Sequence, residues 1–129
     1  MNKQEIEALM NAMNKAMQDE RSKVQMTLGK LIDVLAALPP DSKIEGLDEP
    51  HSYRGYYCDL AFEPSSELRT AGEMLAMCRA CMGQEFTGYK GGEFMMGKST
   101  PVWIAHYGDT GRKIMALEAD GKFTTEEDL

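Results

Sequence analysis

The sequence has few cysteines and no long apolar run, and each shortage excludes a class of protein. Only 3 of the 129 residues are cysteine. Three cysteines cannot all pair within one chain, so a disulfide framework is not expected. No apolar run reaches the roughly 18 to 20 residues of a membrane-spanning helix, and the first residues show no signal-peptide core. The sequence therefore predicts a soluble, cytoplasmic protein.

Basic residues are also in short supply. The chain has 14 Lys and Arg against 21 Asp and Glu, which gives a net charge of −7. Affinity for duplex nucleic acid grows with the number of cationic contacts to phosphate, so a duplex is not an expected partner. The hydrophobic share of 43% is that of a globular chain, and the length predicts a single domain over residues 1–129.

Residues 1–38 are predicted to be helical, as one long helix or two in tandem. Apolar residues recur at steps of three and four from Ile6 to Leu35, and no proline occurs before Pro39. The pattern has a gap at Glu20 and Arg21, and Gly29 makes a break possible. An apolar stripe of this length either folds back on its own core or forms a subunit interface, so we predict an oligomerisation segment here.

The rest of the chain predicts an α+β fold in which a small mixed or antiparallel sheet carries one packed helix. Residues 39–50 are expected to form a polar connector, and residues 51–129 an α/β ligand-binding body. The alternation of side chains between two faces predicts a strand over 52–63. Pro64 predicts the end of this strand, and the two serines after it predict the cap of a helix that should end at Gly83. Two strands, 100–107 and 113–119, should form a hairpin through the glycine-bounded turn 108–111.

Residues 92–99 match a nucleotide-binding pattern: glycine, four residues, glycine, lysine and a hydroxyl residue, here Lys98 and Ser99. A phosphate cradle of this kind must follow a buried strand and open a helix. Here a β-type run follows Ser99, so a true NTPase loop is not favoured. A glycine-rich loop that offers amides and one cation to a bound phosphate is more plausible.

Other candidate catalytic or metal-binding residues have ordinary structural explanations. Cys78 and Cys81 have the spacing of a redox or zinc pair, but they lie on the apolar stripe of the predicted helix, which favours small buried hydrophobes. His106 could act as a base, yet no nucleophile is tied to it by a recognisable pattern. We therefore predict no catalytic residue, no metal site and no cofactor.

Cationic and aromatic residues gather on the predicted sheet and its loops. Arginine pairs with phosphate and aromatic rings stack on bases, so the mixture suits a nucleotide-like small molecule. Aromatic residues in strands are also ordinary core, and composition alone leaves both interpretations open. The candidate ligand-binding residues are Arg54, Tyr56, Phe86, Phe94, Lys98, Ser99, Trp103 and Arg112.

Two segments, residues 53–64 (YRGYYCDLAFEP) and residues 101–114 with PVWIA and GRKI, resemble the first Thoeris anti-defence sponge family of phage proteins. The resemblance implies a protein that binds, without cleaving it, a cyclic ADP-ribose isomer made as a bacterial immune signal. Some members also bind cyclic oligonucleotides. It further implies dimers or larger oligomers such as hexamers, a place in the cytoplasm of the infected host, and ligand contacts by Arg54 and Arg112 with Phe86 or Phe94.

Two other classes of function remain open. An acidic phage inhibitor could bind a host protein directly, and a small nucleotide-processing enzyme could act on a similar ligand. The first predicts an acidic surface without a concave basic site, and the second predicts turnover.

Overall fold

The computed structural model describes residues 2–126 and has the predicted α+β fold, with three helices, a mixed five-stranded sheet and a small two-stranded sheet. The helices are α1 (Lys3–Val24), α2 (Leu28–Ala37) and α3 (Ala71–Cys81). The strands are β1 (Lys43–Ser52), β2 (Leu60–Thr70), β3 (Glu85–Thr87), β4 (Glu93–Met95), β5 (Val102–Ile104), β6 (Arg112–Leu117) and β7 (Phe123–Thr125).

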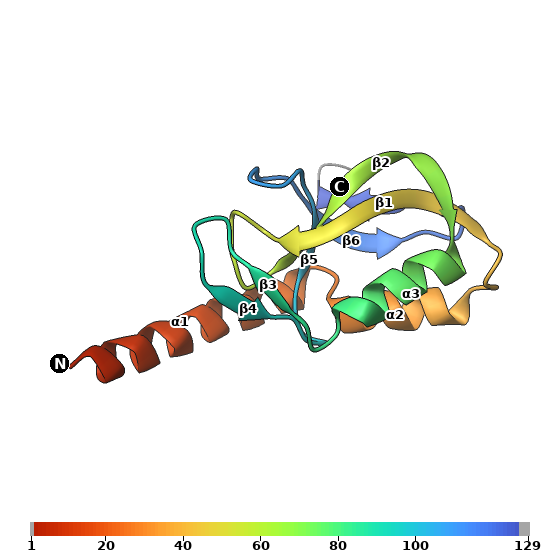
Figure 1. Cartoon of the computed structure of the whole chain (residues 1–129). Coiled ribbons are helices and arrows are strands. Elements are labelled where there is room, and N and C mark those ends of the chain that lie inside the picture. The colour runs from red at the N-terminus through yellow and green to blue at the C-terminus, as the bar shows by residue number, and fades with distance from the viewer. Residues whose placement is uncertain (1, 127–129) are drawn as a thin grey trace.

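The large sheet has the order β1-β2-β5-β6-β7. Strands β2 and β5 are parallel, and the other neighbours are antiparallel. Helices α2 and α3 lie side by side below this sheet (Figure 1). Their apolar faces and the sheet enclose one core, whose largest fully buried side chains include Leu31, Leu35, Phe62, Met74 and Ile114.

The N-terminal helical region is two helices in tandem, and α1 projects away from the body (Figure 1). The break lies at residues 25–27. Met26 donates its N–H to the Ile114 carbonyl, and its own carbonyl accepts the N–H of Val102, so this residue bridges β5 and β6. Most of the apolar face of α1 is exposed, comprising Ile6, Leu9, Met10, Met13, Met17 and Val24.

Gly29, where the sequence makes a helix break possible, lies within α2 and does not interrupt it. A Cβ atom at this position would lie 2.7 Å from the Lys98 Cβ and 2.8 Å from the Lys98 carbonyl oxygen. The glycine therefore allows the loop around Lys98 to pack on the helix, and the helix continues because its N-terminal amides are capped by that loop.

The predicted connector 39–50 is wrong, because its residues from Lys43 onward belong to strand β1. Ile44 and Leu47 are buried three residues apart, and a bulge between Glu45 and Leu47 breaks the two-residue alternation that reveals a strand. Gly46 occupies the bulge, where an added Cβ would meet the Glu67 carbonyl. A bulged, acidic strand with two core residues resembles a connector in sequence.

The predicted strand 52–63 and the stop at Pro64 are also corrected. Residues 53–59 form a tight loop, closed by the hydrogen bond from the Tyr53 N–H to the Asp59 carbonyl. Strand β2 continues through Pro64 to Thr70. Beyond Phe62 it has lost its pairing with β5 and pairs with β1 alone, so a residue without an N–H is tolerated there. Helix α3 then starts at a capping box formed by Thr70 and Glu73.

We predict that Gly29→Ala lowers the free energy of unfolding by about 1 to 3 kcal/mol, because overpacking against Lys98 outweighs the gain in helix propensity. Denaturant unfolding measures the change. Lys30→Ala, an exposed substitution on the same turn, is the control and should stay within about 0.5 kcal/mol of wild type. A more stable Gly29→Ala variant would contradict the packing argument.

Candidate functional site

A cavity of about 390 Å³ lies between the C-terminal half of α1, the loop 53–59 and strand β4. This volume is in the range of small-molecule sites. The loop presents its residues to α1 because it is closed by backbone hydrogen bonds on one side and anchored to the helix on the other. The cavity is lined by Asn14, Met17, Arg21, Arg54, Gly55, Tyr56, Tyr57, Cys58 and Phe94.

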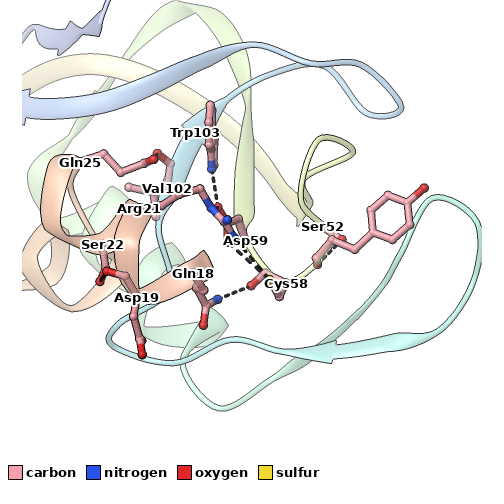
Figure 2. Close-up of polar contacts among 11 residues, drawn as sticks. Gln18, Asp19, Arg21, Ser22, Gln25, Ser52, Cys58, Asp59, Val102 and Trp103 are labelled. Carbon is pink, nitrogen blue, oxygen red and sulfur yellow. Dashed lines mark hydrogen bonds and ion pairs between the residues drawn. The ribbon is translucent and has the colours of Figure 1, made fainter. Parts of the chain in front are cut away.

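Arg21, which lines this cavity, forms a buried ion pair with Asp59 (Figure 2). Its Nε and Nη2 donate to the two carboxylate oxygens of Asp59, at 2.7 and 2.8 Å. The Arg21 side chain is 10% exposed and Asp59 is 0% exposed. Burial opposes the charged guanidinium, but the hydrogen bonds and charge of Asp59 outweigh it, so the pKa of Arg21 is raised above its ordinary value.

Asp59 connects three parts of the fold. Besides Arg21 of α1 it accepts a 2.9 Å hydrogen bond from the indole Nε1 of Trp103 on β5 (Figure 2). Gln18 adds a second link from α1, because its Nε2 donates to the Cys58 carbonyl at 2.9 Å. The end of α1 is thus fixed to the loop 53–59 and through it to the sheet.

Aromatic rings surround the ion pair. The guanidinium carbon of Arg21 lies 3.8 Å from the ring centroid of Tyr56, a cation–π contact. Trp103 stacks on Tyr53 with ring centroids 4.1 Å apart. Tyr56 is 40% exposed, so a face of this cluster remains open to a ligand.

Arg54 is the second arginine of the cavity, and it is exposed. Its Nη1 donates to the Gly108 carbonyl at 2.8 Å, and its guanidinium carbon lies 4.6 Å from the ring centroid of Tyr89. These contacts hold the side chain at the rim without neutralising it. Arg54 therefore offers a full positive charge to the cavity, whereas Arg21 shares its charge with Asp59.

The structure brings together only some of the residues predicted from sequence. Arg54, Tyr56 and Phe94 line the cavity, and Trp103 lies buried behind it. Phe86 pairs with Phe94 across the β3–β4 hairpin and packs on the core. Arg112 lies on β6 opposite Ile104 and is not among the residues that line the cavity.

Arg21 is a site residue that the sequence interpretation missed. The sequence signal for Arg21 is the gap in the apolar pattern at Glu20 and Arg21, where charged residues interrupt the apolar stripe of the predicted helix. In the structure, the Arg21 side chain is buried. Among the described residues of α1, Arg21 is the one that is buried.

The loop with Lys98 and Ser99 does not open a helix, as the phosphate cradle of an NTPase must. Strand β4 precedes it and β5 follows it. Its carbonyls face the start of α2: the Lys98 carbonyl accepts the N–H of Gly29, and the Thr100 carbonyl accepts the N–H of Leu28. The helix amides that could hold a phosphate are thus occupied by the loop itself. Lys98 and Ser99 instead line a separate shallow hollow.

Cys78 and Cys81 are free and buried on the core side of α3, as predicted for packing residues. Burial raises the pKa of the Cys78 thiol to about 12 and that of Cys81 to about 11. The thiols are therefore protonated at neutral pH. His106 is exposed, with Nδ1 3.6 Å from the Glu63 carboxylate, which also contacts His51 Nε2 at 3.0 Å.

No protein-family model, curated protein or solved structure matched this chain. Within residues 2–126, no helix is both long and apolar enough to cross a lipid bilayer. The site is therefore interpreted from its own geometry and chemistry.

We predict that Asp59→Asn lowers the free energy of unfolding by about 3 to 5 kcal/mol, because it leaves Arg21 buried without its counter-charge. The double variant Arg21→Met with Asp59→Asn should lose less stability than the sum of the losses in the two single variants, since the double variant leaves no unpaired charge buried. Denaturant unfolding of the four proteins measures the coupling. Additive losses would show that the pair does not interact energetically.

Proposed function

We propose that the protein binds and sequesters, without cleaving it, a cyclic adenine-containing nucleotide that serves as a bacterial immune signal, namely a cyclic ADP-ribose isomer. The observation that carries the proposal is the cavity in which Arg54 and Arg21 lie beside Tyr56 and Phe94. Guanidinium groups bind phosphate oxygens, and aromatic faces stack on a base. The sequence resemblance to the anti-defence sponge family supports the same ligand class.

Sequestration requires affinity and no chemical step. Contacts to a charged phosphate contribute about 1.5 to 3 kcal/mol each, and base stacking contributes about 1 to 3 kcal/mol. The hydrogen bonds and ring contacts of Arg54 and Arg21 hold both side chains before a ligand arrives, which reduces the entropy lost on binding. Such a site supports binding strong enough to remove a signal from the host cytoplasm.

The exposed apolar face of α1 supports a second part of the proposal, that copies of the chain associate. A helix that buries only Arg21 among its described residues leaves its methionine-rich face in water. Methionine adapts to irregular partner surfaces. The same face also supports the second candidate function, an inhibitor that contacts a host protein, and the two are separated by whether the protein alone associates.

We predict that wild type binds the cyclic ADP-ribose isomer in titration calorimetry and that Arg54→Ala weakens binding about thirtyfold, or about 2 kcal/mol. Arg54→Lys should also bind more weakly, since it keeps the charge and loses the planar fork. Arg79→Ala removes an exposed arginine from α3, outside the cavity, and should bind as wild type does.

The same titration separates the classes of function. Chromatography of the ligand after release should return it unchanged, and an altered ligand would favour the nucleotide-processing enzyme. No heat and no thermal shift at a ligand concentration of about 100 μM would rule out the sponge and leave the protein-binding inhibitor.

We predict that wild type is a dimer or larger oligomer in light scattering at micromolar concentration, and that Met13→Lys lowers its mass. Lysine places a charge in the centre of the apolar face, which a close contact cannot accommodate. Ala12→Lys adds the same charge on another side of α1 and should leave the mass unchanged. A monomeric wild type would show that α1 is not a self-association helix.

A further inference from the structure

The cavity beside Arg54 continues along α1. A second cavity of about 250 Å³ shares Asn14, Cys58 and Phe94 with the first one. The two therefore form one groove, here called the α1 groove, which has α1 as one wall and the loop 53–59 with β4 as the other. The arginines line one end of the groove, and the shared residues lie where its two parts meet.

The wall formed by α1 is rich in amide side chains. Asn11, Asn14 and Gln18 follow at steps of three and four, so they lie on one face of the helix, and Arg21 continues that face. Gln18 is already used, because its Nε2 donates to the Cys58 carbonyl. The side chain of Asn14 makes no hydrogen bond within residues 2–126, so both its amide donor and its carbonyl acceptor are available.

The facing wall carries three aromatic rings, Tyr56, Tyr57 and Phe94, and of these Phe94 lines both cavities. The position of Phe94 is fixed by its neighbours. The Tyr57 ring meets it edge-on with centroids 5.9 Å apart. The backbone of Gly88 covers another part of the ring, since a Cβ there would lie 2.9 Å from Phe94 Cε2. The part of Phe94 that remains accessible lines both cavities, opposite Asn14.

We propose that Asn14 is the residue that selects adenine, by reading the edge of a base that stacks on Phe94. An asparagine amide matches adenine, because its oxygen accepts a hydrogen from the exocyclic N6 amine while its nitrogen donates to N7. The phosphates of the ligand would then extend to the end of the groove with Arg54 and Arg21. This assignment rests on the proposed function and adds the orientation of the ligand.

Hypoxanthine is the base that tests this assignment. It differs from adenine in carrying an oxygen acceptor at position 6 in place of the amine. Either orientation of the Asn14 amide then sets one acceptor against another, while stacking on Phe94 and the phosphate contacts remain unchanged. A site that relied on stacking and charge alone would bind both bases equally.

The experiment compares the cyclic ADP-ribose isomer with its hypoxanthine counterpart by titration calorimetry. Wild type should prefer the adenine ligand about tenfold or more, the range expected of one bidentate amide–base contact. Asn14→Ala should reduce that preference to near unity. Asn14→Asp should bind the adenine ligand more weakly than wild type, because the carboxylate cannot donate to N7, although it still accepts from the N6 amine. Gln4→Glu makes the same amide-to-carboxylate change on α1 outside the groove and should keep both the affinity and the preference of wild type.

The outcomes separate this inference from the proposed function. If the cyclic isomer binds and Asn14→Ala retains the adenine preference, the assignment of Asn14 is wrong and the sponge stands. If the cyclic isomer does not bind, the sponge is wrong, and ADP-ribose with its hypoxanthine counterpart then decides about Asn14. An adenine preference for ADP-ribose that Asn14→Ala abolishes supports the assignment, and equal or absent binding of this pair overturns it.

Discussion

The buried ion pair between Arg21 and Asp59 determines where α1 lies, and the groove exists because α1 is held there. Charge pairs removed from water are stable only when their hydrogen-bonding geometry is good. Here the guanidinium makes two short bonds to one carboxylate, which also accepts the Trp103 indole N–H. The Asp59 carboxylate, which belongs to the loop 53–59, is therefore hydrogen-bonded to a helix and to a strand. Residues of these three elements form or support the same cavity.

The two helices of the N-terminal region are held to the rest of the fold by different interactions. Helix α2 buries Leu28, Leu31 and Leu35 in the core, whereas α1 buries Arg21. The first is held by the hydrophobic effect and the second by a directional polar contact near its C-terminal end. A helix fixed at one end and apolar along an exposed side can serve as the wall of a binding groove and as a contact surface at once.

The sequence was sufficient for the fold class because the strongest patterns are local. The amphipathic helices have a recognisable period of three to four residues and the β5–β6 hairpin has clear turn residues, and both appear in the structure. Strand β1 could not be recognised, because the bulge at Gly46 breaks its alternation. The end of β2 was misplaced because Pro64 normally stops a strand, and only the missing pairing with β5 beyond Phe62 shows why it does not.

The candidate site could be predicted only in part, for a related reason. Residue type indicated Arg54, Tyr56 and Phe94, since their chemistry suits a nucleotide wherever they lie. Arg21 and Asn14 belong to the helix, and their role depends on which face of α1 meets the loop 53–59, which is a tertiary fact. The gap in the apolar pattern marks Arg21 as unusual but does not show which residues it contacts, and Asn14 has no local signature. The motif around Lys98 shows the opposite case, in which a local pattern is present but the structural context is missing. Its residues match the sequence of a phosphate-binding loop, but the loop accepts hydrogen bonds from α2 through its carbonyls.

The location of the charges also explains how a chain with a net charge of −7 can offer a site for an anion. Exposed charges farther apart than a Debye length, about 8 Å at physiological salt, contribute little to one another's field. The local balance in the cavity therefore matters more than the total. The charge of Arg21 is offset by Asp59. Among residues 2–126, the Arg54 guanidinium contacts a carbonyl and a tyrosine ring but no carboxylate. An arginine without a carboxylate partner in a groove is therefore compatible with the small phosphate ligand proposed above, even in an acidic chain.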